Sequence, residues 1–592
     1  MDSYRVFRHF IPACFVLSCA QPPPLNGSKT PAASLAPTPD PFQATIDWNP
    51  DQISEPNGGW FRVKAPATVL PRLLLLSGDP SLRGFSDLRT LAGLTLGGQL
   101  ASLIDFDAPI DLLVSSAEEQ PWMVGAARVA NADGFEPKKL GEALRPLSRG
   151  RWEIHPDDGG ENLRCELWNV APPVGYRVLC SKEQDEITRA APFLLGRLAK
   201  EPLASDARLE IPRAMFAKHL KPQDQDATST DPGARLGRSW IESLSEAQRL
   251  AVDVKLLEQD VELGIAFEYL ADGKSPLLEA WLGEPNKEPL PAQFWPLLDQ
   301  ASIAFASAGT DPQTAKAAAG SSGTAAQIFE ELTVSSGIPR ELLARMTREL
   351  GDVFPHRYRF VFFQSGALPG LRSNSAKANA GNANSWMLLG LAGSGDRYKA
   401  GLNVLLEASK RAPVARGPSK NPPQARFVLV NKRFPDLPNE SFIYRSETPT
   451  GTTYFTWVLP SADWVWLLSA RSERQLLDQA RALLPKLRDP VAPDKEQVAL
   501  FGDKPPLLAL SVSLAGWQNL DTKSLSKVDL TTLPFGGSAR IFARANGERR
   551  QRESGATFSL ELWSRWSPAA IADIVALIKL RAKAKRETAS EH

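Results

Sequence analysis

The stretch GYRVLCS at residues 175–181 recurs as DWVWLLS at residues 463–469, 288 positions further along the chain. At the same spacing Pro172, in the turn that precedes the first stretch, corresponds to Pro460. In each place two apolar runs flank a short turn, a pattern that is typical of a β-hairpin. We therefore expect the same hairpin to occur twice.

A helix is predicted after each hairpin, because apolar residues recur there at helical spacing. Ser181-x-x-Gln184 and Ser472-x-x-Gln475 are typical of capping boxes at the start of these helices. Pro192 lies inside the first helix and is expected to kink or divide it. The apolar residues are Ile187, Ala190, Leu194 and Leu198 in the first helix and Leu476, Ala480, Leu483 and Leu487 in the second.

Further segments match in the same order along the chain. WMVG at residues 122–125 pairs with WMLL at 386–389. Strands that alternate with helices and tight hairpins predict an α+β fold, with two tandem copies of a mixed, mainly antiparallel sheet-and-helix domain. We expect the first copy at residues 59–285, the second at 286–583 and a short charged tail at 584–592.

Length and charge limit the class of protein. A chain of 592 residues is too long for one hydrophobic core, so several domains are expected. A hydrophobic content of 43% is typical of globular proteins. The 68 basic and 67 acidic residues nearly cancel, leaving no strong positive field for nucleic acid. We therefore predict a globular, multidomain protein and no nucleic-acid partner.

Residues 1–18 have the layout of a signal peptide. Arg5 and Arg8 precede an apolar stretch from Phe10 to Leu17. This stretch is far shorter than the ~20 residues that a membrane-spanning helix needs. A cleaved export signal is therefore predicted, with a buried N-terminal strand as the alternative.

VLSC at residues 16–19 resembles the lipobox of bacterial lipoproteins. The resemblance implies that Cys19 carries the lipid, becomes the first residue and holds the protein to a membrane. Leu17 departs from the smaller residue that is usual at its position, and Pro12 and Cys14 interrupt the apolar stretch. An ordinary cleaved signal and lipidation at Cys14 are the alternatives. In lipoproteins an Asp after the acylated Cys is associated with inner-membrane retention. Because Ala20 and Gln21 stand there, the resemblance implies the outer membrane, facing the periplasm.

Residues 19–58 are predicted to form a lipidated, proline-rich tether. Residues 20–58 contain nine prolines together with Gly, Ser, Thr and Ala. Such a composition buries little apolar surface, and proline-rich chain extends by ~3.1 Å per residue. The tether would hold the folded body away from the membrane.

Cys165 and Cys180 lie on either side of the turn of the first hairpin. If the strands pair symmetrically about that turn, the two residues lie opposite each other with a Cα distance of ~4.5–5.5 Å. A disulfide is then possible, and an oxidising compartment would permit it. Two unlinked buried thiols are the alternative. At a spacing of 288, Thr453 and Leu468 would be their counterparts in the second copy.

The sequence contains no nucleophile elbow, phosphate loop or metal-ligand spacing. His155, His219 and His356 are each isolated from a sequence-local acid or nucleophile. Asp105 and Asp107 fit an edge strand or turn better than a pair of catalytic carboxylates. We therefore predict no catalytic residue, no cofactor-binding residue and no metal site.

The last helix begins near Pro568 and is predicted to bury one apolar face. Basic residues at its end complement the helix dipole. We expect a solvated helix end, with contact to anionic lipid as the alternative. The apolar face comprises Ile571, Ile574, Val575 and Ile578, and the basic residues are Arg581, Lys583, Lys585 and Arg586.

These features predict a membrane-anchored bacterial envelope lipoprotein with a non-catalytic binding, carrier or scaffolding role. LASDARL at residues 203–209 also resembles a turn of bacterial envelope proteins of unknown function. Besides the membrane, an envelope polymer or an apolar ligand is the expected partner. The alternative is an envelope hydrolase whose site is assembled from distant residues.

Overall fold

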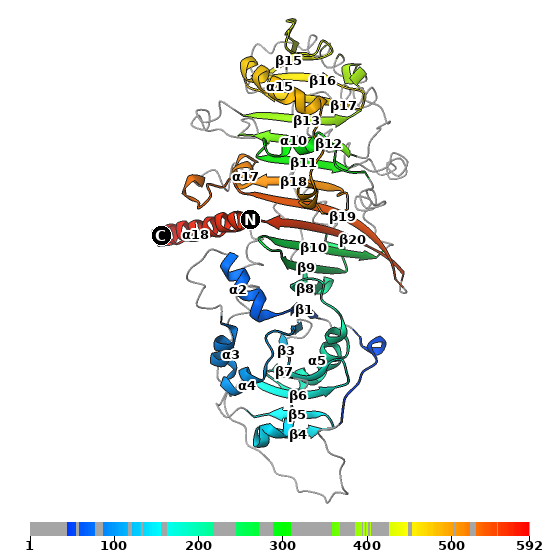
Figure 1. The fold of residues 1–592 in the computed structure, drawn as a ribbon, viewed down its shortest axis with the longest axis vertical. Coiled ribbons are helices and arrows are strands. Elements are labelled where there is room, and N and C mark those ends of the chain that lie inside the picture. The colour runs from blue at the N-terminus through cyan, green and yellow to red at the C-terminus, as the bar shows by residue number, and fades with distance from the viewer. Residues whose placement is uncertain are drawn as a thin grey trace, which may run out of the picture. The chain divides into compact units, whose positions relative to one another are not determined.

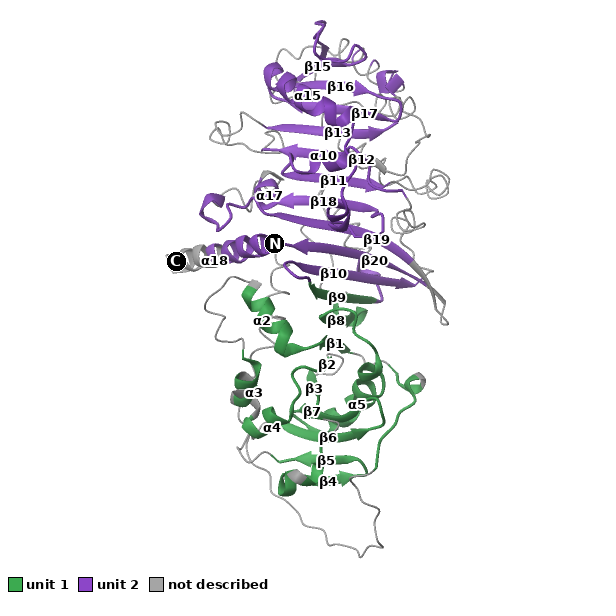
Figure 2. Cartoon of the chain, viewed as in Figure 1, with its two compact units in different colours: residues 1–221, 249–256 green, residues 222–248, 257–592 purple. Residues whose placement is uncertain are grey.

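The chain folds into two compact units, unit 1 (residues 1–221 and 249–256) and unit 2 (residues 222–248 and 257–592), coloured in Figure 2. The predicted signal peptide and Cys19 lie outside the described residues, as do His219 and His356. The computed structural model describes residues 44–54, 58–76, 87–115, 121–131, 134–155, 163–216, 244–270, 288–308, 358–366, 385–393, 395–396, 398–400, 403, 406, 426–447, 453–502, 504–520, 529–552 and 555–590.

The described strands of unit 1 form one antiparallel sheet (Figure 1). Successive side chains along each strand point to opposite faces of the sheet. In sheet order the strands are β9 (Arg249–Leu256), β8 (Ala207–Pro212), β1 (Gly58–Val63), β2 (Ile110–Ser115), β3 (Trp122–Arg128), β7 (Gly175–Ser181), β6 (Arg164–Val170), β5 (Arg151–Ile154) and β4 (Leu144–Ser148).

Helices cover both faces of the unit 1 sheet. On one face α5 (Gln184–Ala191), the π-helix η5 (Pro192–Arg197) and η6 (Leu198–Lys200) pack on Leu113, Val124 and Leu179. On the other face α3 (Leu88–Leu96) and α4 (Gly98–Leu103) pack on Ala127 and Trp152. The other helices of this unit are η1 (Pro50–Gln52), α2 (Pro66–Leu76), η4 (Pro137–Ala143) and α6 (Arg213–Phe216).

The described strands of unit 2 also pair antiparallel throughout. The order from β19 to β14 repeats, strand for strand, the order from β9 to β4 in unit 1. The prediction of a mixed, mainly antiparallel protein is therefore confirmed. In sheet order the strands are β10 (Val261–Leu270), β20 (Gly555–Trp566), β19 (Arg540–Arg552), β18 (Leu508–Ser513), β11 (Ile303–Ala308), β12 (Tyr358–Ser365), β13 (Trp386–Ala392), β17 (Trp464–Ala470), β16 (Thr453–Pro460), β15 (Phe442–Glu447) and β14 (Arg426–Leu429).

The core of unit 2 is rich in aromatic side chains. Phe294 of α10 packs on Phe363 with ring centroids 5.6 Å apart. Trp464 and Trp466 stack with ring centroids 5.6 Å apart and are both buried, so both belong to this core. No helix in the described ranges has the length and apolar content to span a membrane. The helices are α10 (Phe294–Leu298), α15 (Glu473–Arg488), α16 (Lys495–Ala499), α17 (Leu514–Leu520), η9 (Leu530–Thr532) and α18 (Pro568–Ser590).

The second strands of the two hairpins, β7 and β17, correspond at a spacing of 289, one residue longer than the predicted 288, and the first strands, β6 and β16, correspond at 291. A spacing of 288 would place Leu179 on Leu467. Leu179 packs on α5, whereas Leu467 clusters with Tyr398 and Tyr444, away from α15. Successive strand residues point to opposite faces, so a shift of one restores the match. The N-caps of α5 and α15, Glu183 and Ser472, are 289 positions apart.

The predicted helix starts are partly correct. Ser472 caps α15 by accepting the Gln475 N–H at 3.2 Å. The first helix instead begins with a capping box at Glu183, because the Ser181 hydroxyl donates to the Met123 carbonyl at 2.6 Å. Pro192 divides that helix as predicted, since α5 ends beside it and continues as a π-helix.

Residues 44–54 pack on the β6 strand and the helices of unit 1, although they belong to the segment predicted to form a tether. The Ile46 N–H donates to the Asn169 carbonyl at 2.8 Å, and Trp48 lies 5.8 Å from Trp168 between ring centroids. Large apolar side chains interrupt the proline-rich composition here and provide surface to bury. The preceding part of the predicted tether lies outside the described residues.

Helix α18 buries a different face from the predicted one. Ala570, Asp573 and Leu577 are buried, whereas Ile578 is 48% exposed. The Asp573 carboxylate accepts the backbone N–H of Phe535 at 2.7 Å and of Gly537 at 2.9 Å. These two bonds fix the orientation of the helix, which apolar spacing alone could not reveal.

Candidate functional site

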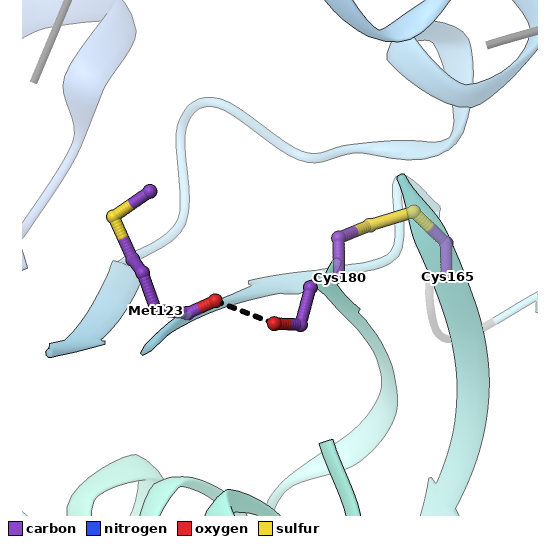
Figure 3. Close-up of a disulfide and its surroundings, with 4 residues drawn as sticks. Met123, Cys165 and Cys180 are labelled. Carbon is purple, nitrogen blue, oxygen red and sulfur yellow. Dashed lines mark hydrogen bonds between the residues drawn. A yellow bond between two sulfur atoms is a disulfide. The ribbon is translucent and has the colours of Figure 1, made fainter. Parts of the chain in front are cut away.

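The predicted disulfide between Cys165 and Cys180 is confirmed (Figure 3). The two residues are paired directly across β6 and β7, with a Cα distance of 4.2 Å and an S–S distance of 2.09 Å. Figure 3 also shows, beside the disulfide, the hydrogen bond that the Ser181 hydroxyl donates to the Met123 carbonyl. The disulfide therefore links two neighbouring strands in the interior of the unit 1 sheet.

Unit 2 has a hydrogen bond where unit 1 has the disulfide. Counted from the helix N-caps, Cys180 corresponds to Ser469, whose partner on β16 is Thr456. The two hydroxyls are 2.9 Å apart. The predicted counterparts, Thr453 and Leu468, are not the paired residues, because the spacing is 289 on the second strands (Cys180 to Ser469) and 291 on the first strands (Cys165 to Thr456).

Those of the sequence-predicted polar residues that the structure describes, His155, Asp105 and Asp107, do not assemble into a reactive cluster. His155 is 52% exposed and lies 3.3 Å from the Glu153 carboxylate. Asp105 accepts the Asp107 N–H at 3.0 Å, which agrees with a turn. Within the described ranges, no three His, Cys, Asp or Glu side chains are grouped as metal ligands.

The polar site that stands out is buried in unit 1 and was missed by sequence reasoning. We call Arg62, Asp111 and Arg177 the charge cluster. They come from β1, β2 and β7, and their exposed fractions are 4%, 1% and 6%. A charged residue at an inward position of an alternating strand was the available signal, since such residues are seldom buried without partners.

Arg62 connects the sheet to the end of the helical segment above it. It is paired directly with Asp111 across β1 and β2, and its Nε lies 2.9 Å from Asp111 Oδ1. Its Nη1 donates to the carbonyls of Leu198 at 2.6 Å and Glu201 at 2.7 Å. One guanidinium therefore joins the buried carboxylate to the first residue of η6 and to the residue that follows η6.

Arg177 adds a second positive charge to the same buried region. Its Nε and Nη1 atoms are buried without a hydrogen-bond partner. Burial lowers the pKa of Arg177, and Asp111 opposes that shift. With Asp111 ionised, the three side chains carry one excess positive charge.

Burial raises the pKa of Asp111 to about 6, because the ionised carboxylate is removed from water. Arg62 and Arg177 act in the opposite direction, since positive charge favours the ionised form. The chemistry that the charge cluster offers is thus a change of protonation within the physiological range. Its carboxylate is 1% exposed, so contact with a substrate is blocked by the surrounding protein.

Comparison with known proteins provides no relative for this chain. No family model, no curated protein sequence and no solved structure matches it.

Proposed function

We propose that this chain is an exported, lipid-anchored protein of the bacterial envelope, with a non-catalytic binding or scaffolding role. In this proposal Cys19 carries the lipid and residues 19–43 form the tether. Ala20 and Gln21, and no Asp, follow Cys19, which favours the outer membrane with the folded body facing the periplasm.

The observation that carries the proposal is the disulfide between Cys165 and Cys180. Disulfides of this kind persist in oxidising compartments and are rare where thiols are kept reduced. The signal-peptide layout of residues 1–18 leads to such a compartment. The two features lie far apart in the sequence and support export independently.

Two observations support binding or scaffolding over catalysis. The strongly shifted carboxyl, Asp111, is enclosed between arginines and does not reach solvent. His155 lies on the surface beside Glu153. A general acid or base must lie within hydrogen-bond reach of its substrate, and the buried position of Asp111 prevents this.

We further propose that the two units arose by tandem duplication of one domain. The support is the shared order of nine strands and the matching position of a helix after each hairpin. The order β9-β8-β1-β2-β3-β7-β6-β5-β4 is matched by β19-β18-β11-β12-β13-β17-β16-β15-β14. A solved structure in which these two sheets superpose would support the duplication, and a different strand order in one of them would refute it.

Metabolic labelling tests the anchor directly. The full chain and its Cys19→Ala variant are expressed in a bacterial host with an alkyne analogue of palmitate, and the envelope fractions are separated. We expect label and outer-membrane location for the wild type and loss of both in the variant. Equal labelling of the two proteins would refute attachment at Cys19. Free thiols at Cys165 and Cys180 in the envelope fraction would refute the oxidising location.

A further inference from the structure

Exposed apolar side chains gather around one small cluster at the C-terminal end of unit 2. The cluster consists of buried Leu530, Leu533 and Leu577 with partly buried Leu514 and Ala515. It joins α17, the segment that contains η9, and α18. Figure 1 shows α17 and α18 at the same ends of the strands.

Each of the three elements exposes a large apolar residue beside this cluster. Trp517 on α17 is 49% exposed and Phe535, after η9, is 53% exposed. On α18, Leu580 is 40% exposed and lies about one turn after Leu577, on the same side of the helix. We call Trp517, Phe535 and Leu580 the apolar rim. Single exposed apolar residues are ordinary, but several around one cluster are typical of an interaction surface.

The loop that presents Phe535 is held rigidly. The Asp573 carboxylate accepts its N–H and that of Gly537, and Asp573 is 1% exposed. The Ala515 N–H donates to the Gly537 carbonyl at 3.0 Å, which links the loop to α17. The exposed position of Phe535 is therefore built into the fold.

Basic residues follow the apolar rim directly along α18. The helix continues to Ser590, and the segment from Lys579 to Arg586 holds five basic residues and no acidic one. Anionic lipid attracts such a segment, while Trp and Phe side chains bury well at the level of the headgroups.

We propose that the apolar rim and the basic end of α18 form a docking surface for an anionic lipid membrane. The surface acts in addition to the lipid on Cys19 and does not depend on it. In this proposal unit 2 contacts the bilayer through Trp517, Phe535 and the C-terminal half of α18. A protein partner is the competing occupant, and the experiment below distinguishes it.

The test uses the full chain with Cys19→Ser, so that no lipid anchor contributes. Its sedimentation is measured with vesicles of phosphatidylcholine alone and of phosphatidylcholine mixed with phosphatidylglycerol. We expect binding to the anionic vesicles, weakened by salt. Trp517→Ser with Phe535→Ser should reduce the affinity roughly tenfold or more. Lys583→Gln and Lys585→Gln should reduce it roughly fivefold each, only on anionic vesicles.

Val491→Ser is the matched control, because Val491 is 75% exposed and lies outside these elements. It should bind as the parent does, and circular dichroism melts should show all variants folded. The proposal would be overturned if the protein bound neutral and anionic vesicles equally, or if it still bound as tightly after both aromatic residues were replaced. Absence of vesicle binding would overturn it as well. If cross-linking in cells then joined the apolar rim to a protein, a protein partner would replace the membrane.

Discussion

Unit 1 and unit 2 share a strand order but treat buried charge differently. Among the described residues, unit 2 buries one charged side chain, Asp573, which lies on α18 and not in the sheet. Unit 1 buries five, all on its strands. They are Arg62, Asp111, Glu166, Arg177 and Glu210. The same arrangement of strands is thus compatible with a charged or an apolar interior.

The helix-covered face of the unit 2 sheet shows what replaces the charges. Where β1 and β2 carry Arg62 and Asp111, β11 and β12 present Ala306, Val361 and Phe363, all fully buried. A buried ion pair often contributes no more stability than well-packed apolar residues in the same space. This strand order therefore does not require a buried charge cluster, and we expect removal of the whole cluster to destabilise unit 1 less than removal of one member.

The largest effect is expected from removing one member of the charge cluster. Arg62→Met leaves Asp111 without its nearest counter-charge and removes the donor to Leu198 and Glu201. We expect unit 1 to lose about 3–5 kcal/mol of unfolding free energy. Hydrogen exchange measured by mass spectrometry should show faster exchange in β1, β2 and η6.

Arg540→Met in unit 2 is the matched control. Arg540 also holds main-chain carbonyls, donating to Ala301 at 2.7 Å and to Leu298, but it has no buried carboxylate partner. Its loss should cost about 1–3 kcal/mol, because no buried charge is left unpaired. If the two substitutions lowered the unfolding free energy equally, the buried carboxylate of unit 1 would not account for the cost of removing Arg62.

The next effect is a pH dependence that only unit 1 should show. The pKa of Asp111 is about 6 in the folded chain and near 3.8 when exposed. A carboxyl with a raised pKa contributes stability that is complete below about pH 4 and is lost as the pH rises through about 6. Relative to Asp111→Asn, the wild type should lose about 3 kcal/mol between these limits. Urea titrations of both proteins from pH 4 to 7 measure the difference, and parallel curves would contradict it.

Much of this architecture could be predicted from the sequence. The parts that could not be predicted depend on how the strands pair, which the sequence does not reveal. Periodicity predicted the hairpins, their helices and the disulfide. Register was missed by one residue, because a match between Leu179 and Leu467 scores well in sequence while reversing the faces. The charge cluster was missed because Arg62, Asp111 and Arg177 are far apart in the chain and meet only through strand pairing.

A smaller effect should follow from giving unit 1 the link that unit 2 has. Cys165→Thr with Cys180→Ser copies the Thr456 and Ser469 pair. The disulfide closes a loop with a sequence separation of 15, for which loop entropy predicts about 3 kcal/mol, less in a hairpin that forms on its own. We expect a loss of about 2 kcal/mol with the fold retained, measured by thermal melts.

The alanine pair at the same two positions is the control for this exchange. It should be less stable than the Thr and Ser pair by about 1 kcal/mol, the usual net contribution of one hydrogen bond. Identical melts of the two double variants would show that the hydroxyls do not pair in unit 1. Unfolding of either variant at room temperature would show that the disulfide is essential to unit 1, contrary to the comparison with unit 2.

The smallest change in unfolding free energy is expected when all three residues of the charge cluster are replaced together. Replacing the whole charge cluster at once, by Arg62→Met, Asp111→Leu and Arg177→Met, makes this part of unit 1 apolar, as it is in unit 2, and leaves buried Glu166 and Glu210 in place. The triple variant leaves no buried charge unpaired, so it should lie within about 1 kcal/mol of the wild type, although Arg62→Met alone costs several times more. It should also lose the pH dependence assigned to Asp111. A triple variant as unstable as the single one would mean that the carbonyls of Leu198 and Glu201 need the Arg62 donor, and that the charge cluster serves to hold η6 on the sheet.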